Sequence, residues 1–595
     1  MRFIGLALLV AAIVTTGSPR TASAIPYEQN PMRLGQKALE EGKIDEAIAQ
    51  FRKSVKDSPN SFRPRYWLGE ALRLNGNLTE AQKTFEEAIQ LDATASDGYA
   101  GLGNTALAIG DTTMALQAFS RATQIDKGYW EAHYGLGRIA LARGDTTSAR
   151  DHFRFGEKKE DEGEILYATG MGLLQLAQGK VDQAELYLTK AKASRPNNSE
   201  IRRALADLYV TKNVPGLAIA EYEKGIELQP KNAQLHYELG RLYVRTKLYN
   251  DGLTEFRKVS EIDSTYADAY LQMGRLYNAA KKWSESAWAF GRYVTYKPTS
   301  EGFILLAEAH REAGSLKASC QALSEALKYD SASPELARDL ARCQFDVKDT
   351  ANAVPGYEQL MTANPEVLEG IDYKNLAKIY LDRKRNDRAR PLFEQAALRD
   401  TTLRDVHFYL GYMDLVGKNY ESSVQHFDAE VRINPSSVNS YAYKGMALQA
   451  MKQNDAAIES MRRVVEIDST YVQGWLWYGQ SLAAAEKYRE AEEAYRKVLE
   501  LKEGSADALR GIGFIYLMQK RYDDALPVLR RAVEADPSNL QGQVWLAQCL
   551  LLLNRDDEAE QAFQRVLARD SGNKDAQKGL QVIKARRDQR ELKGE

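Results

Sequence analysis

Small and hydrophobic residues recur along this chain at helical spacing, in short stretches separated by polar turns. Residues 506–539 show one unit of this pattern. Leu509 and Tyr516 share one face of a first predicted helix, because residues three and four apart are neighbours on a helix. Ala525 and Leu529 likewise share one face of a second predicted helix. The stretch therefore predicts a pair of short amphipathic helices joined by a tight turn.

The same unit recurs every 34 residues. Sixteen units begin at 28, 62, 96, 130, 165, 199, 233, 267, 300, 334, 370, 404, 438, 472, 506 and 540, with one extra residue before 165, one missing before 300 and two extra before 370. Position 8 is Gly or Ala in every unit, as at Gly513. Position 20 is Ala in twelve units, as at Ala525, and position 24 is always large and apolar, as at Leu529.

This repetition determines the predicted architecture. A pair of short helices cannot bury its apolar face alone, so neighbouring pairs must stack on both sides. Small residues at positions 8 and 20 let the two helices approach closely, and the bulky residue at position 24 fills the space beside them. We expect an all-α solenoid that grows by adding units, without a Gly-, Ser- or Pro-rich linker that divides it.

The chain resembles the tetratricopeptide repeat (TPR) family in three features. These are the 34-residue period, the small residues at positions 8 and 20 followed by a bulky residue at position 24, and a frequent proline at position 32. Seven repeats carry that proline: Pro59, Pro196, Pro230, Pro298, Pro365, Pro435 and Pro537. The resemblance implies a right-handed superhelical solenoid of helix-turn-helix repeats over residues 25–573. The amphipathic pattern that follows predicts a capping helix and tail at 574–595. The resemblance also implies that positions 2, 5, 9, 12 and 13 of each first helix line a concave groove. A fold of this kind does not by itself fix what the groove binds.

The first 24 residues predict a secretory signal peptide. Arg2 precedes an apolar run over 3–14, and a small, polar stretch ends at Ala22-Ser23-Ala24, which matches the A-x-A type of cleavage site. The apolar run is shorter than the roughly 20 residues that span a bilayer. We expect an exported protein, periplasmic if the source is bacterial and otherwise secreted, with no integral membrane segment after cleavage. An uncleaved membrane anchor is the alternative.

Composition and charge narrow the class of partner. The chain carries 80 Lys and Arg against 82 Asp and Glu, and 44% of its residues are hydrophobic. This balance gives no electrostatic drive toward nucleic acid. We therefore expect protein or peptide partners and no nucleic acid, while the oligomeric state is not predicted.

We find no pattern of catalytic, metal-binding or cofactor-binding residues. His133, His236 and His407 occupy position 4, where other repeats carry aromatic residues, and His152 and His426 occupy position 23. No H-E-x-x-H motif, His/Cys cluster or phosphate-binding loop is present in the sequence. We predict that the protein is not an enzyme and has no cofactor or metal.

Three cysteines are unusual in an exported chain, where thiols tend to be oxidised. Cys320 and Cys343 fall on neighbouring predicted helices, so a disulfide between them is one interpretation. Small buried thiols at helix-packing positions are the commoner case, and we expect them here and at Cys549.

Two stretches of the predicted groove have distinct character. In repeats 10 and 11, positions 5 and 9 are cationic, and one further cation lies a repeat earlier; this basic patch consists of Arg338, Arg342, Lys374, Lys378 and Arg311. It suits an acidic segment or a terminal carboxylate, which Arg can bind through two hydrogen bonds. The alternative is that nearby Glu308, Glu312, Asp346 and Asp382 neutralise these cations within the groove.

Toward the C-terminus the groove positions become apolar and aromatic, with Phe408, Tyr412, Phe514 and Met518 as candidate contacts. Such a surface suits an amphipathic helix or an extended apolar peptide, whereas a role in internal packing is the alternative. We expect a scaffold or assembly factor of the cell envelope. A subunit that guides a glycan or polymer along the groove is the alternative function.

Overall fold

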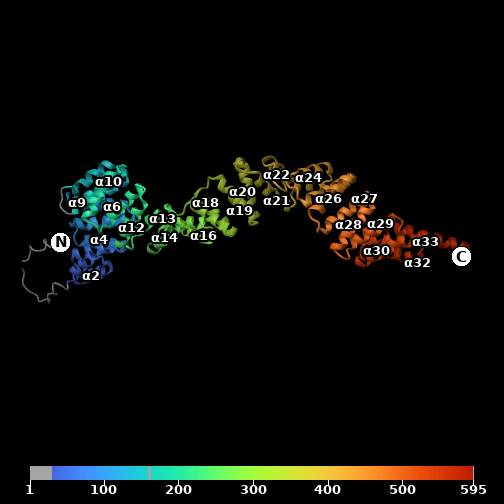
Figure 1. Ribbon diagram of the computed structural model, residues 1–595, viewed down its shortest axis with the longest axis horizontal. Helices are drawn as coiled ribbons and strands as arrows, with labels where there is room; N and C mark the ends of the chain where they lie inside the picture. The colour runs from blue at the N-terminus through green and yellow to red at the C-terminus, as the bar shows by residue number, and fades with distance from the viewer. Residues whose placement is uncertain (1–29, 158–161, 594–595) are drawn as a thin grey trace, which may run out of the picture. The chain divides into compact units, whose positions relative to one another are not determined.

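The computed structural model describes residues 30–157 and 162–593, and every regular element in these ranges is helical. This confirms the all-α prediction. Sixteen helix pairs follow one another (Figure 1). The first helices of the pairs are α1 (Pro31–Glu40), α3 (Phe62–Leu74), α5 (Ser96–Ile109), α7 (Trp130–Ala142), α9 (Glu162–Ala177), α11 (Ser199–Thr211), α13 (Ala233–Arg245), α15 (Ala267–Ala279), α17 (Ser300–Glu312), α19 (Pro334–Asp346), α21 (Gly370–Asp382), α23 (Val406–Val416), α25 (Val438–Ala450), α27 (Val472–Ala484), α29 (Ala506–Met518) and α31 (Leu540–Leu552).

The second helices pack against them in the same order. They are α2 (Ile44–Asp57), α4 (Leu78–Leu91), α6 (Thr112–Ile125), α8 (Thr146–Phe153), α10 (Val181–Ser194), α12 (Pro215–Leu228), α14 (Tyr249–Ile262), α16 (Trp283–Tyr296), α18 (Leu316–Tyr329), α20 (Thr350–Ala363), α22 (Asn386–Arg399), α24 (Tyr420–Ile433), α26 (Asn454–Ile467), α28 (Tyr488–Leu501), α30 (Tyr522–Ala535) and α32 (Asp556–Arg569), and α33 (Lys574–Lys593) follows the last pair. Short 3₁₀ turns at Arg154–Gly156 and Pro365–Val367 lie beside the two insertions. The predicted signal peptide lies outside the described residues.

The helices form two compact units that divide within α18, between residues 322 and 323. We call them the N-terminal array, up to residue 322, and the C-terminal array, from residue 323. The sequence carries no linker at this point, so the division was not expected. None of the described helices is both long enough and apolar enough to cross a membrane.

The core of each array repeats one packing unit, in which the bulky residue at position 24 fills the gap between two small residues. Phe119 of α6 is fully buried. A Cβ atom on Gly103, at position 8 of the same repeat, would lie 2.6 Å from the Phe119 ring, and a Cβ atom on Gly135 of the next repeat would lie 2.3 Å from it. Real Cβ atoms do not approach so closely, so the ring requires glycine on both sides. The small residue of the next repeat, at position 6, was not identified from the sequence.

The turn inside each helix pair depends on one residue with a left-handed backbone. Position 15 has positive φ in all sixteen pairs, as at Gly42 (74°) and Lys520 (60°). Glycine adopts this conformation without steric cost, whereas other residues are strained there. Ten of the sixteen positions nonetheless carry a non-glycine residue. The tight packing of the two flanking helices therefore fixes the turn even where the residue does not favour it.

Two of the three cysteines are not the buried free thiols that we expect from the sequence. Cys320 and Cys343 are both disulfide-bonded, so the buried-thiol prediction is wrong for them. Cys549 is a buried free cysteine, and burial raises its pKa to about 11. Its Sγ donates to the backbone carbonyl of Tyr522 at 3.3 Å, which holds the neutral thiol in place.

Candidate partner-binding surface

From α23 onward, the first helices of the C-terminal array form one continuous layer. In the C-terminal array, α23 contacts α25, α25 contacts α27, α27 contacts α29, and α29 contacts α31. No two second helices make a comparable contact with each other among the described residues. Since the layer with the closer helices is the inner side of a curved stack, the first helices line the inner face, as the family resemblance implies.

The basic patch is held mainly by intramolecular partners. Arg342 donates to both oxygens of Asp372, at 2.6 and 2.7 Å, and Asp372 is almost fully buried. The hydrogen bond to Asp372 is the main reason that the pKa of Arg342 is raised. Arg338 pairs with Asp339 at 3.0 Å and with Glu369 at 3.5 Å. Both arginines are thus already engaged by carboxylates of this chain.

Lys374 and Lys378 differ although both lie on α21. Lys374 donates to the backbone carbonyl of Arg404 at 2.7 Å and lies 3.6 Å from Asp405, with 15% of its side chain exposed. Lys378 has no hydrogen bond or ion pair among the described residues and is half-buried. Arg311 belongs to the N-terminal array, where 62% of its side chain is exposed and Glu312 lies 3.9 Å away. The structure therefore leaves Lys378 as the available cation of the patch in the C-terminal array.

The predicted contacts Phe408 and Tyr412 lie together on α23. Their rings are stacked, with centroids 6.4 Å apart. Tyr443 of α25 contacts both rings, at 5.8 Å from Phe408 and 5.5 Å from Tyr412. Phe408 is half-buried, whereas Tyr412 remains 37% exposed. Phe408 therefore contributes mainly to packing, and Tyr412 presents an aromatic surface to solvent.

A second aromatic contact lies further along the same face. Phe514 of α29 packs on Trp545 of α31, with ring centroids 4.8 Å apart. Met518, one turn after Phe514, is 49% exposed, and Leu552 at the corresponding position of α31 is 47% exposed. Val416 occupies this position on α23 and is 63% exposed. The ends of three first helices thus expose large apolar side chains.

These residues belong to an uncharged surface that extends over five consecutive repeats. We define the apolar strip as positions 9, 12 and 13 of repeats 12–16, and none of its members carries a charge: Tyr412, Leu415, Val416, Met446, Gln449, Ala450, Gln480, Ala483, Ala484, Phe514, Leu517, Met518, Gln548, Leu551 and Leu552. Leu517 is buried, whereas the other members are half-buried or exposed. The same positions of repeats 10 and 11 include Arg342, Asp346, Lys378 and Asp382. The change from charged to uncharged therefore occurs between α21 and α23.

The inner face of the N-terminal array is charged and largely paired. Arg138 of α7 lies 3.2 Å from Glu200 of α11. Burial opposes ionisation of Glu200, but Arg138 and Arg203 outweigh it and lower the pKa of this carboxyl group. Lys231 also lies 3.6 Å from Asp45, so the turn after the sixth helix pair reaches back to the first. These ion pairs therefore join repeats that are not adjacent in the sequence.

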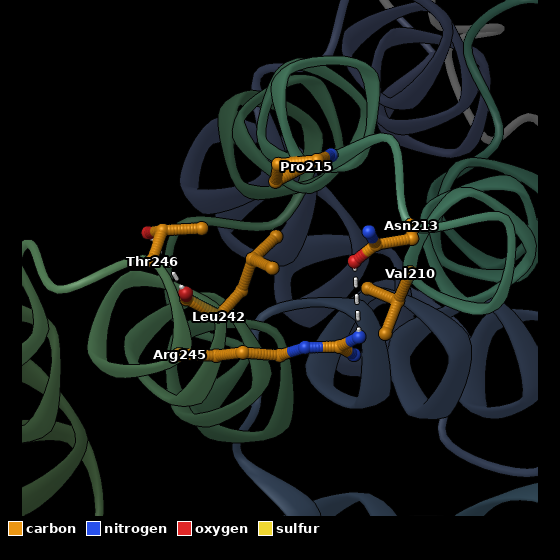
Figure 2. Close-up of a pocket in the computed structure, with 6 residues that line it drawn as sticks. All are labelled: Val210, Asn213, Pro215, Leu242, Arg245 and Thr246. Atoms are coloured by element: carbon orange, nitrogen blue, oxygen red, sulfur yellow. Dashed lines mark hydrogen bonds between the residues drawn. The ribbon is translucent and has the colours of Figure 1, made fainter.

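A pocket of about 80 Å³ lies between the turn at Asn213–Pro215 and α13, where Arg245 donates to the side-chain oxygen of Asn213 at 3.2 Å (Figure 2). Sites for small organic ligands measure roughly 300–1,000 Å³. Groups of three or more His, Cys, Asp or Glu side chains that could hold a metal ion do not occur within the described ranges.

The sequence patterns did not reveal that the histidines lie in pairs. His133 contacts His152, and His407 contacts His426, through ring nitrogens 3.0 and 3.2 Å apart. Each pair joins positions 4 and 23 of one repeat. The equal spacing of 19 residues was the available signal, but a helical periodicity argument does not relate residues on two different helices.

Sequence profiles of known families match most of the array. Tetratricopeptide repeat profiles match residues 32–96, 101–154, 374–438, 444–506, 478–539 and 516–583, and a TPR repeat profile matches residues 216–247. No curated protein matches the chain.

Solved structures with similar arrays share little sequence with this chain. The TPR protein YrrB, described as having an unusual peptide-binding site, is 22% identical over 31% of this chain and 95% of its own, with a TM-score of 0.29. Naa15/Naa10 bound to HypK-THB is 12% identical over 94% and 96%, with a TM-score of 0.31. The C-terminal part of a TPR repeat-containing protein from Cytophaga hutchinsonii is 19% identical over 40% and 98%, with a TM-score of 0.35.

Proposed function

Because the chain belongs to the tetratricopeptide repeat family, we propose that it is a non-enzymatic scaffold that binds a protein partner through the apolar strip of its C-terminal array. The observation that carries this proposal is the exposure of Tyr412, Val416, Met518 and Leu552 on one uncharged inner face. Large contiguous apolar surfaces on a soluble chain mark interaction sites more often than single exposed residues do. The partner segment is uncharged and apolar where it contacts the strip, as in an amphipathic helix or an extended peptide.

The basic patch has a smaller part in this proposal. Arg338, Arg342 and Lys374 have carboxylates or carbonyl groups of the same chain as partners, so a ligand would have to displace them. Lys378 is half-buried next to the start of the strip and has no such partner among the described residues. It supports binding of a partner segment with an acidic residue at one end.

We also propose that the protein is exported and acts in the cell envelope. The signal-like sequence over 1–24 supports export. The disulfide-bonded state of Cys320 and Cys343 supports it independently, because disulfides persist in oxidising compartments and are rare in the cytosol. Mass spectrometry of the protein from its natural source is the test. A chain that begins at Ile25 is expected, and a chain that retains Met1 would contradict cleavage.

Selection of short random peptides by display on the full mature chain tests the binding proposal. We expect the selected peptides to be rich in apolar and aromatic residues. A Met518→Lys, Leu552→Lys double variant should bind them about a hundredfold more weakly, since two buried lysines would cost about 3 kcal/mol in lost contact and desolvation. Leu398→Lys is the matched control, because Leu398 is 75% exposed on the second helix α22.

Three outcomes are informative. Loss of binding in the double variant but not in the control supports the strip as the binding surface. Equal binding by all three proteins excludes the strip. The glycan-guiding alternative gains support if no peptide is selected but oligosaccharides bind, although Tyr412 and Tyr443 already have ring contacts with other aromatic residues.

A further inference from the structure

Positions 4 and 23 of a repeat form a slot where the two helices of the pair can be joined by polar side chains. Four repeats use it in this way. Arg202 pairs with Glu221 at 2.7 Å, and His236 pairs with Glu255 at 2.5 Å. In the other two repeats both positions are histidine: His133 and His152, and His407 and His426. Two slots therefore pair a basic side chain with a glutamate, and two hold a pair of histidines.

The geometry of the His407–His426 pair is that of a hydrogen bond. The two Nδ1 atoms are 3.2 Å apart, and the ring centroids are 5.5 Å apart. With the two nitrogens this close, the ring centroids can be this far apart only if the Nδ1 atoms lie on the line between the two rings and face each other. Two ligands of one metal ion would instead point toward a third position and bring the rings closer. The contact therefore requires one hydrogen between the two nitrogens, which one neutral ring donates and the other accepts.

The second histidine of this pair continues into a buried network. Asp414 of α23 is only 2% exposed, and its Oδ2 lies 3.7 Å from His426 Nε2. Ser422 donates to the same carboxylate at 2.6 Å, and Arg390 of α22 donates to its other oxygen. Asp414 is therefore occupied by partners other than His426.

The remaining charges around the pair do not favour its protonation strongly. The carboxylates of Asp414 and Glu394 favour a proton on His426, whereas Arg390 opposes it. Arg432 of α24 opposes a proton on His407. Burial is the largest effect and lowers the pKa of both rings, and the charge of His426 lowers the pKa of His407 further. The folded state thus binds these protons more weakly than the unfolded chain, whose histidines titrate near 6.5.

We propose that the His407–His426 pair is a proton-operated latch, which holds α23 against α24 at neutral pH and opens when both rings become protonated. Two protonated rings place one N–H against another and bring two positive charges together, so the contact is lost. The stability that the pair contributes is present above pH 6.5 and falls as the pH drops through the lowered pKa values. His133 and His152 have the same arrangement, with His133 Nε2 also 3.0 Å from the carbonyl of Lys127 and with Asp126, Asp145 and Asp151 nearby.

The latch can regulate the proposed binding surface, an extension that rests on the function proposed above. His407 precedes Phe408 on α23, and the same helix carries Tyr412 and Val416 of the apolar strip. Movement of α23 relative to α24 would separate Phe408 from Phe427, whose rings are now 6.0 Å apart. Acid would therefore disorder the first part of the strip.

Hydrogen exchange on the full chain without any partner tests the latch itself. After correction for the intrinsic exchange rate, protection of amides in α23 and α24 should fall about tenfold between about pH 7.5 and about pH 5.5, because each proton bound below a lowered pKa changes the equilibrium tenfold per pH unit. The internal reference is the repeat with Tyr270 and Ala289 in the same slot, which has no titrating pair.

A His407→Tyr, His426→Ala variant reproduces that reference slot and should lose the pH dependence in α23 and α24. The latch would be overturned if acidification reduced protection in this variant as much as in the parent protein, or if it reduced no protection in the parent protein. If the variant does not fold, NMR titration of isotope-labelled histidines in the parent protein decides the same point: titration of both rings below pH 6.5 supports the pair, and independent titration near about 6.5 contradicts it. Loss of peptide binding in the strip variants is a separate measurement, so failure of the function would leave this test intact.

Discussion

Replacing Phe119 with alanine is expected to lower the stability of the N-terminal array by about 3–5 kcal/mol, the cost of removing a fully buried phenylalanine. The ring is 0% exposed and lies between Gly103 and Gly135 of consecutive repeats. Neither glycine has a side chain that can move into the space, so the cavity would remain open. Because each repeat depends on its neighbours, the loss should spread to the adjacent pairs.

Hydrogen exchange of the full chain in increasing urea would measure this effect repeat by repeat, which a single unfolding midpoint cannot do for a long array. The matched control is Leu186→Ala, since Leu186 is 72% exposed on α10 of the same array. We expect the control to change stability by less than about 0.5 kcal/mol. Equal effects of the two variants would contradict the role assigned to position 24.

Arg342→Glu is expected to destabilise the C-terminal array by about 3–5 kcal/mol, because it removes the partner of a buried charge and adds a like charge beside it. Asp372 has no exposed side-chain surface and accepts two hydrogen bonds from Arg342. Lys378→Glu, on the next first helix, should be nearly neutral for stability, since no partner of Lys378 occurs among the described residues.

Thermal unfolding and hydrogen exchange of α19 and α21 in the two variants provide the comparison. Similar stability of both would contradict the description of the basic patch as internally paired. The comparison also determines how the patch should be tested for binding. Lys378→Glu changes the charge of the patch and keeps the Arg342–Asp372 contact, whereas any substitution of Arg342 breaks that contact.

The repeat pattern predicted the helix pairs because small and bulky residues at fixed positions report directly on packing between helices. It located Phe119 and Gly103 as one packing unit, but it did not identify Gly135, whose position is not small in every repeat. Periodicity relates residues on one helix, and the contact with the next repeat depends on how the pairs stack. The division within α18 has no composition signal for the same reason.

The surface was less predictable than the core. The sequence suggested Asp346 and Asp382 as carboxylates that could neutralise the basic patch. In the structure, the carboxylates that pair with Arg342 are Glu369 and Asp372, which the sequence pattern did not identify. Glu369 lies in the two-residue insertion before repeat 11, and Asp372 lies in the first turn of α21. The histidine pairs were likewise hidden, because their contact crosses the turn between two helices.

The central claim is that the apolar strip contacts the partner, and site-specific photo-crosslinking in the natural source tests it most directly. A photoreactive amino acid at Met518 would report on the strip, and one at Leu398 on a comparably exposed apolar site of a second helix. We predict a discrete protein adduct from Met518 and none from Leu398, with the Met518 adduct lost when Leu552→Lys is added. Adducts from Leu398 alone, or the same adducts from both positions, would contradict the account.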